Sequence, residues 1–318
     1  MVRCLIIALF VLTSCALPRA HREFSVKDSG SGDQSGEFAS SKDLLVSGLV
    51  SEGLALSQGG RFLEAEGRLR QARYLEPAND RISFNLAVII NQSGQSEESL
   101  AILTRLLSNE PQNPNYLQGI ADANLSLRNY DKTREYLKEA FELVKGVGNN
   151  ARAAVLARSI SNVAFGAGYE QEALCYSYEA VTLGPSPVQY ATHARLLVAL
   201  NLFSQAETFL KSKSGALNEP LANHVVALAR YGQGNFRGAL EAEEGALGRI
   251  SQAPELSQEV TVAWWLMKAK LPDDKRDDVG QERERELRDD VIQFGQKQGY
   301  ELVMWPAALR RELVRLRG

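Results

Sequence analysis

A period of 34 residues constrains the fold of this chain more than any other feature of its sequence. Pro77 and Pro111 lie 34 residues apart, and each closes a run that is predicted to be helical. Between such runs come short breaks that contain Gly or Asn, usually beside an aromatic residue. The breaks recur at residues 59–62, 93–95, 128–130, 168–169, 201–203 and 234–236. A period of this length predicts repeated helix pairs that stack along one direction.

Small side chains recur at fixed places within the period. Two antiparallel helices approach to roughly 8–10 Å only where the side chains at their crossing leave room. The small residues expected at these crossings, first in the leading helices and then in the second helices, are Gly53, Ala87, Ala121, Ser161, Ala194 and Ala227, and Ala65, Ser99, Thr133, Ala173, Ala206 and Ala239. A third small position is filled by Ala72, Ala140, Ala180 and Ala246, whereas Leu106 and Lys213 depart from it.

This pattern resembles the tetratricopeptide repeat, with closing prolines at Pro77, Pro111 and Pro185. The resemblance implies an all-α fold, a right-handed α-solenoid of about six helix pairs over residues 44–250. Repeats would start near residues 46, 80, 114, 154, 187 and 220, with an insertion at 145–150 and the weakest match in the fifth repeat. One pair cannot bury its apolar face alone, so neighbouring pairs must stack. The alternative is an ordinary helical bundle with accidental periodicity, against which six correlated breaks argue.

The N-terminus predicts export. A short positive stub is followed by an apolar run at residues 4–12, too short for a permanent membrane-spanning helix, and then by small residues before Cys15. Residues 1–14 therefore form a predicted signal peptide whose end resembles a bacterial lipobox. The resemblance implies that Cys15 carries lipid, and the absence of aspartate at Ala16 favours the outer membrane. The alternatives are an ordinary signal peptide cut after a small residue such as Ala16 or Ala20, and an uncleaved anchor.

The segments before and after the repeats do not follow the repeat pattern. Residues 15–43 are predicted to be a flexible tether, because residues 27–42 are rich in Ser, Gly and Asp. Residues 251–318 are predicted to be a helical C-terminal cap, since a solenoid needs its end covered. Within them we expect helices over residues 255–271 and from Trp305 onward, with Pro306 at a helix start. The basic last helix is alternatively a contact surface for anionic lipids or an acidic partner.

Composition and motifs argue against catalysis and against nucleic-acid binding. The net charge is −3, whereas a nucleic-acid-binding protein needs a strongly basic face. We find no sequence motif for a zinc protease, a serine hydrolase or a phosphate loop. Loss of Cys4 with the signal and lipidation of Cys15 leave Cys175 alone, which predicts a buried thiol. His193 and His224 without a third ligand make a poor metal site. We expect no cofactor, no metal and no small-molecule substrate.

In the tetratricopeptide family the first helices of successive pairs line a groove, through repeat positions two, five, nine, twelve and thirteen. The resemblance implies that the following residues line a partner-binding groove here: Arg81, Phe84, Asn91, Asn115, Gln118, Asp122, Arg158, Asn162, Phe165, Arg195, His224 and Tyr231, together with Val88, Gln92, Leu125 and Leu228. Amides pair with a partner's backbone, and aromatic rings anchor apolar side chains. The alternative for each residue is solvated surface.

Three of these groove residues form a candidate receptor for a carboxylate. Arg158, Asn162 and Arg195 offer N–H donors, and arginine donates in a planar fork. The five-residue clamp that some members of the family use is incomplete, because other residues stand at three of its positions. These residues are Thr192, Leu221 and Val225. Binding of a chaperone tail by such a clamp is therefore not expected.

These observations predict a protein that binds other proteins and has no catalytic activity. The first hypothesis is a lipid-anchored scaffold on the periplasmic face of the outer membrane that helps to assemble a pilus or secretion system, of the type IV or Tad type, and this likeness rests on architecture alone. The second is an adaptor for peptidoglycan-remodelling enzymes or proteases. An enzyme with its site in the C-terminal region is the third, and no motif supports it.

Overall fold

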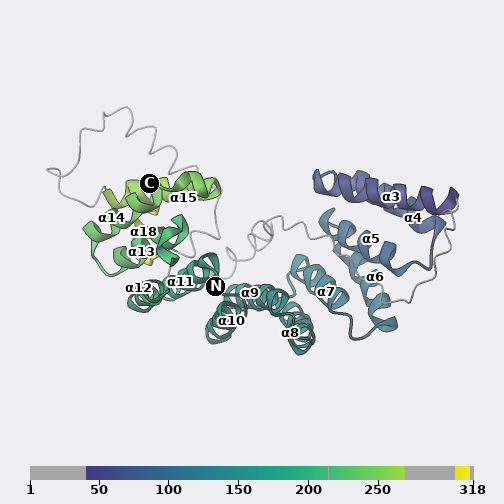
Figure 1. Cartoon of the computed structure of the whole chain (residues 1–318), viewed down its shortest axis with the longest axis horizontal. Coiled ribbons are helices and arrows are strands. Elements are labelled where there is room, and N and C mark those ends of the chain that lie inside the picture. The colour runs from purple at the N-terminus through teal and green to yellow at the C-terminus, as the bar shows by residue number, and fades with distance from the viewer. Residues whose placement is uncertain (1–40, 214, 269–304, 316–318) are drawn as a thin grey trace. The chain divides into compact units, whose positions relative to one another are not determined.

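The computed structural model describes residues 41–213, 215–268 and 305–315, and these segments are helical and contain no strand (Figure 1). The predicted signal peptide (1–14), the predicted lipidation site Cys15 and nearly all of the predicted tether (15–43) lie outside the described residues. The described residues up to Val144 form one compact unit, here called the N-terminal unit, and those from Lys145 onward form a second, the C-terminal unit. Sequence analysis did not predict this division.

Three helix pairs make up the described part of the N-terminal unit. Its helices are α3 (Ser41–Gln58), α4 (Phe62–Leu75), α5 (Asp80–Gln92), α6 (Ser96–Asn109), α7 (Pro114–Ser126) and α8 (Tyr130–Gly146), of which the last two residues are assigned to the C-terminal unit. Helix α3 packs on α4 and α5 on α6, while α4 also packs on α5 and α6 on α7. Each pair thus covers the apolar side of its neighbour, as the repeat requires.

The C-terminal unit contains three further pairs and a C-terminal addition. Its α-helices are α9 (Asn150–Gly166), α10 (Glu170–Leu183), α11 (Pro187–Ala199), α12 (Phe203–Ser212), α13 (Pro220–Gly232), α14 (Phe236–Leu247), α15 (Ser257–Lys268) and α18 (Ala307–Arg315). Short 3₁₀ turns lie at Ala216–Asn218, Ile250–Gln252 and Pro254–Leu256. Helix α15 packs on α14, and α18 contacts α13 and α15.

Every predicted break between the two helices of a pair is a turn, and each turn uses one residue with a positive φ. The six equivalent residues are Gly60, Gly94, Arg128, Gly168, Asn201 and Gly234. Glycine adopts this left-handed conformation without a Cβ clash, whereas other residues are strained in it. The breaks at Arg128 (φ 60°) and Asn201 (φ 62°) therefore keep the turn geometry at a local energetic cost.

The predicted small residues lie buried at the helix crossings, and the hydroxyl-bearing ones also hydrogen-bond across them. The Ser99 Oγ donates to the Ala87 carbonyl at 2.7 Å, and the Ser161 Oγ donates to the Ala173 carbonyl at 2.7 Å. All four residues are at most 3% exposed. A hydroxyl at this place is thus compatible with the core, because the facing backbone carbonyl satisfies it.

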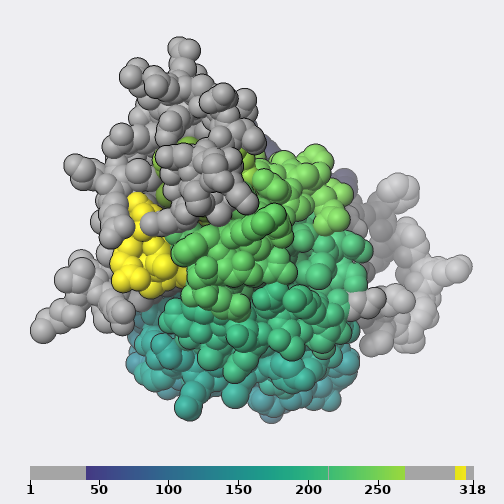
Figure 2. Space-filling view, turned by 90° about the vertical axis from the view of Figure 1, so that its left-hand side faces the viewer, coloured from purple at the N-terminus to yellow at the C-terminus, as the bar shows by residue number. Residues whose placement is uncertain are grey.

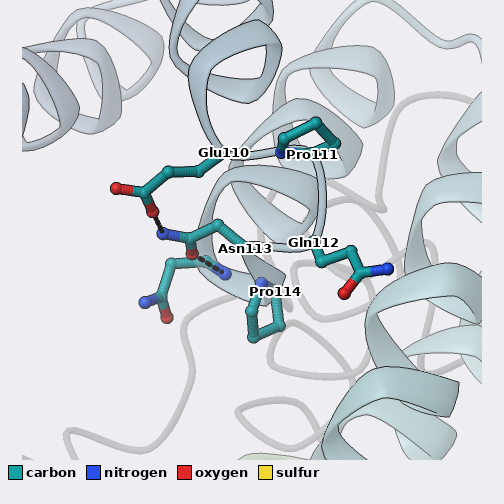
Figure 3. Close-up of a pocket in the computed structure, with 6 residues that line it drawn as sticks. Glu110, Pro111, Gln112, Asn113 and Pro114 are labelled. Carbon is teal, nitrogen blue, oxygen red and sulfur yellow. Dashed lines mark hydrogen bonds between the residues drawn. The ribbon is translucent and has the colours of Figure 1, made fainter.

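The turns that join successive pairs in the N-terminal unit share one capping arrangement. In Figure 3 the Asn113 Nδ2 donates to Glu110 Oε2 at 2.6 Å, while Asn113 Oδ1 accepts from the backbone N–H of Asn115 at 2.9 Å. Pro114 then begins α7, where its missing N–H costs nothing. Asn79 bonds Glu76 and the N-terminus of α5 in the same way one period earlier. The Glu-Pro-x-Asn pattern thus ends one pair and starts the next.

The two irregular places in the repeat have simple structural forms. The insertion predicted at 145–150 lengthens α8 and α9 to 17 residues each, so α9 begins at Asn150 and not near 154. The fifth pair exists, but α12 is only 10 residues long and ends before Lys213. The Lys213 ammonium lies 5.1 Å from the Phe209 ring centroid and 5.6 Å from that of Tyr190. A lysine fits at this position because its charge lies over aromatic faces.

Candidate protein-binding surface

The inner face of a helix pair is defined here as repeat positions two, five, nine, twelve and thirteen of its first helix. On α5 and α7, the predicted residues of this face reach solvent except Leu125, which is buried, so the prediction is wrong for that residue. Arg81 and Asp122 are exposed, and Phe84, Asn91, Asn115 and Gln118 are half-buried. The Phe84 ring packs 5.5 Å from the Tyr116 ring, centroid to centroid, which holds its position.

Helix α9, in the C-terminal unit, also has an open inner face. Asn162 is exposed, and Arg158 and Phe165 are half-buried. Phe165 packs against the core cluster that contains Ala164 and Leu196, so its ring is fixed at one edge. The three residues occupy positions five, nine and twelve of the fourth repeat and lie on successive turns of one helix. They offer a cation, an amide and an aromatic ring on one surface.

Two charged groups on these open faces are desolvated. Surrounding protein atoms raise the pKa of Asp122 to about 7 by desolvation, although the side chain remains accessible to solvent. Desolvation also lowers the pKa of Arg158. Within the described part of the chain, neither group forms a salt bridge. Ionisable groups perturbed in this way are typical of functional sites.

The prediction of an open groove is wrong for the sixth pair. His224 and Leu228 are 0% exposed and Tyr231 is 2% exposed. The cover comes from outside the repeats, because Trp305 and Leu309 join the same core cluster as Tyr231. Figure 2 shows α18, in yellow, against the green surface of the last helix pair. The inner face of α13 is therefore filled by the C-terminal segment of the chain itself.

A buried ionic cluster lies beneath this cover. One oxygen of Glu259, Oε1, accepts from Arg195 Nη2 at 2.5 Å, from His224 Nε2 at 3.2 Å and from Trp305 Nε1 at 2.8 Å. On the other side of the imidazole ring, His224 Nδ1 lies 2.7 Å from Glu243 Oε1. The five residues come from α11, α13, α14, α15 and the start of the α18 segment. The cluster thus links α11, α13 and α14 of the last two repeats to α15 and to Trp305.

The electrostatics favour a charged histidine between two carboxyl groups. Burial alone would lower the pKa of His224, but the carboxylates of Glu243 and Glu259 raise it to about 9. Burial would likewise raise the pKa of Glu259, but Arg195 and His224 hold it at about 2. Burial raises the pKa of Glu243 despite His224. The carboxyl groups of Glu243 and Glu259 face the two different ring nitrogens of His224. Among the described residues, no three His, Cys, Asp or Glu side chains are grouped so that they could hold a metal ion.

Arg195 has a different role from the one predicted. Its guanidinium does receive a carboxylate, but this carboxylate belongs to Glu259 of the same chain, and the Arg195 side chain is only 15% exposed. The predicted receptor for a partner's carboxylate thus keeps only Arg158 and Asn162 on an open surface. Sequence analysis missed Glu243 and Glu259 because no repeat rule marks them. Leu228, an apolar residue at an inner-face position, was the available signal that something covers this helix.

The prediction of a buried thiol at Cys175 is wrong. Cys175 is exposed, because α10 buries Ala173, Ser177 and Ala180, and residue 175 lies on the opposite side of the helix. It lines a surface pocket of about 560 Å³ together with His193. His193 is buried, its Nδ1 lies 2.9 Å from the Ser177 Oγ, and burial together with the nearby Lys213 lowers its pKa to about 4. The imidazole is therefore neutral at physiological pH.

Comparison with known proteins supports the repeat assignment. The tetratricopeptide repeat profile matches residues 56–123. A tetratricopeptide repeat protein from Parabacteroides merdae has a similar structure, with a TM-score of 0.58 and 16% identity over 85% of this chain and 99% of that chain. PilF from Pseudomonas aeruginosa is also similar, with a TM-score of 0.50 and 15% identity over 69% of this chain and 97% of that chain. Among curated proteins, no sequence matches this chain.

These likenesses confirm the predicted fold class, an all-α solenoid of tetratricopeptide-type helix pairs. Identities this low show the fold alone and carry no function with them. The matching profile describes a repeat and not a catalytic family. In the part of the chain that the structure describes, no helix is long and apolar enough to cross a membrane.

Proposed function

We propose that this protein is a scaffold of the bacterial cell envelope that binds another envelope protein on the open inner faces of α5, α7 and α9. Folds built from this repeat present helical surfaces for protein–protein contact. Lipid on Cys15 would hold the protein on the periplasmic face of the outer membrane. The bound protein would be a component of an assembling complex, such as a pilus or a secretion channel.

One observation carries the proposal most directly. Asp122 and Arg158 reach solvent on the open inner faces, nearby protein atoms raise the pKa of Asp122 and lower that of Arg158, and neither forms a salt bridge with a described residue. Desolvating a charge costs free energy unless something compensates for it. A cation of a bound protein at Asp122 in the N-terminal unit and, independently, a carboxylate at Arg158 in the C-terminal unit would each supply that compensation. Asn162 and Phe165 lie beside Arg158 in the repeat and offer an amide and an apolar anchor to the same partner.

The test is capture of the partner by the full chain after chemical crosslinking in intact cells. We expect Asp122→Asn and Arg158→Gln each to lower the yield of the same partner by about tenfold, because each removes a charge-assisted contact. Glu139→Gln on α8 and Arg237→Gln on α14 are the matched controls, since both side chains are exposed on second helices. Equal losses in the controls, or no loss in the inner-face variants, would contradict the proposed surface.

The same experiment distinguishes the two hypotheses about the partner. Recovery of a pilus or secretion component supports the assembly role. Recovery of a wall hydrolase or a protease would favour the adaptor role and overturn the assembly role. Anchoring is tested separately by metabolic labelling with a fatty-acid probe, which should tag the natural chain and not a Cys15→Ser variant.

A further inference from the structure

The C-terminal segment occupies on the sixth pair the surface that α9 leaves open on the fourth. Trp305 is 1% exposed and Leu309 is 0% exposed, and both belong to the cluster that contains Leu228 and Tyr231 of α13. Helix α18 contacts α13 and α15. In sequence, the segment is separated from α15 by residues 269–304. An element from outside the repeats therefore fills an inner face.

The segment binds this surface through one polar anchor and one apolar side. The Trp305 indole N–H donates to Glu259 Oε1 at 2.8 Å, beside His224 and Arg195. Pro306 follows and α18 begins at Ala307, so the indole is placed at the start of the helix. Leu309 points into the core, whereas Arg311, two residues later on the opposite side of the helix, is exposed. Helix α18 is thus amphipathic, and its apolar side faces α13.

This geometry is that of helix-in-groove recognition within one chain. An amphipathic helix lays its apolar face on an apolar surface, and a tryptophan with a hydrogen-bonded N–H is a frequent anchor of such contacts. Tryptophan is also enriched among the residues that dominate binding energies. The surface of α13 and α15 therefore has the shape and chemistry to receive a short amphipathic helix with an N–H donor at its start.

We propose that Trp305 and α18 are an internal ligand, which an amphipathic helix of a partner protein displaces from the sixth pair. The proposal rests on the proposed function, because displacement matters only if the inner faces bind partners. While the segment is bound, partner binding is confined to the open faces of α5, α7 and α9. When it leaves, Leu228 and Tyr231 of α13 become available as a further surface of the C-terminal unit. The occupant we infer is a helix with an aromatic N–H donor, because Glu259 accepts that hydrogen bond.

The first test is hydrogen exchange in the natural full-length chain. A displaceable segment opens without unfolding the unit on which it lies. We expect the amides of α18 to exchange at least about tenfold faster than those of α13. Trp305→Phe keeps the ring but removes the donor to a charged acceptor, and it should accelerate α18 exchange by a further factor of about ten without changing α13. Arg311→Ala is the control on the same helix. Equal protection of α18 and α13 would show that α18 is an integral end cap and would overturn the proposal.

The second test adds the segment as a separate molecule. The probe is a fluorescent peptide of residues 304–318, and the recipient is the full chain with Trp305→Ala and Leu309→Ala. We expect saturable binding to this variant and at least about tenfold weaker binding to the natural chain, whose site is filled. Loss of helicity in the C-terminal unit of the variant, or no binding to the folded variant, would contradict the proposal. Neither test involves an external partner, so their outcome is independent of whether the open faces bind the expected protein.

Discussion

The inner faces of α9 and α13 belong to the same compact unit and occupy equivalent positions of the fourth and sixth repeats, yet only the first is open. At the ninth repeat position α9 has an exposed Asn162, whereas α13 has Leu228 with 0% exposure. At the twelfth position Phe165 is half-buried and Tyr231 is 2% exposed. The backbone pattern of the two helices is alike, so the difference arises from Trp305 and α18, which no repeat contains. The repeat pattern predicts which side of a first helix forms the inner face. Whether that face is exposed to solvent depends on packing by a segment outside the repeats, here Trp305 and α18.

The largest expected effect comes from removing the acceptor that holds the filled face together. Glu259→Ala would leave Arg195 and His224 buried without their shared carboxylate, and breaking a buried ion pair costs about 3–5 kcal/mol. We expect urea to unfold the C-terminal unit at a much lower concentration.

The measurement is tryptophan fluorescence, because all three tryptophans of the chain, Trp264, Trp265 and Trp305, lie in the C-terminal unit. Asn162→Ala on the open face of α9 is the control and should change stability by less than about 0.5 kcal/mol. Similar losses in both variants would mean that the filled and open faces do not differ energetically as described.

A pH titration of the C-terminal unit should show an effect on the order of a few kcal/mol, because His224 and Glu259 beneath the filled face have strongly shifted pKa values. The raised pKa of His224, about 9, gives stability that is complete below about 6.5 and is lost as pH rises through 9. The lowered pKa of Glu259, about 2, gives stability that is present above 4.5 and is lost as pH falls through 2. The raised pKa of Glu243 acts oppositely, since its ionisation disfavours folding above pH 4.5.

In the same unit, the lowered pKa of His193, about 4, gives stability that is complete above about pH 6.5 and is lost as pH falls toward 4. We therefore expect the C-terminal unit to be most stable near pH 6.5 and to weaken toward both pH 4 and pH 9. His224→Gln should remove most of the alkaline loss. Stability curves followed by tryptophan fluorescence from pH 4 to 10 check this, and an alkaline slope that is unchanged in His224→Gln would show that another group is responsible.

The smallest expected change in stability comes from substitutions at the breaks between paired helices, which both units contain. Arg128 in the N-terminal unit and Asn201 in the C-terminal unit have positive φ where the other breaks have glycine. A left-handed residue other than glycine costs roughly 1–2 kcal/mol, and glycine loses about 0.5–1 kcal/mol more conformational entropy on folding.

Arg128→Gly should therefore stabilise the chain by about 0.5–1 kcal/mol, and Asn201→Gly should stabilise it by less, because asparagine tolerates this conformation better. Circular dichroism melting curves measure both variants. Destabilisation by Arg128→Gly would indicate that the arginine side chain makes contacts that outweigh its backbone strain.

The repeat made most of the fold predictable, because tight helix crossings need small residues and their spacing is visible in the sequence. The same local logic located the breaks, including the one at Asn201. It failed where the answer depended on segments far apart in the chain: nothing near His224 in sequence indicates that Glu259 and Trp305 will bury it. The prediction that the Cys175 thiol is buried failed for a different reason. It rested on a general expectation about lone thiols, whereas the helical periodicity of α10 places Cys175 on the solvent-exposed side.

The contrast between open and filled inner faces can be measured most directly by thiol labelling at equivalent repeat positions. The full chain with Cys4, Cys15 and Cys175 replaced by serine would carry either Asn162→Cys or Leu228→Cys, and both thiols would be titrated with the same maleimide under native conditions. We predict that the thiol at position 162 reacts nearly as fast as a free thiol and that the one at position 228 reacts on the order of 100-fold more slowly, because it becomes accessible only when α18 opens. Equal rates at the two positions would contradict the account.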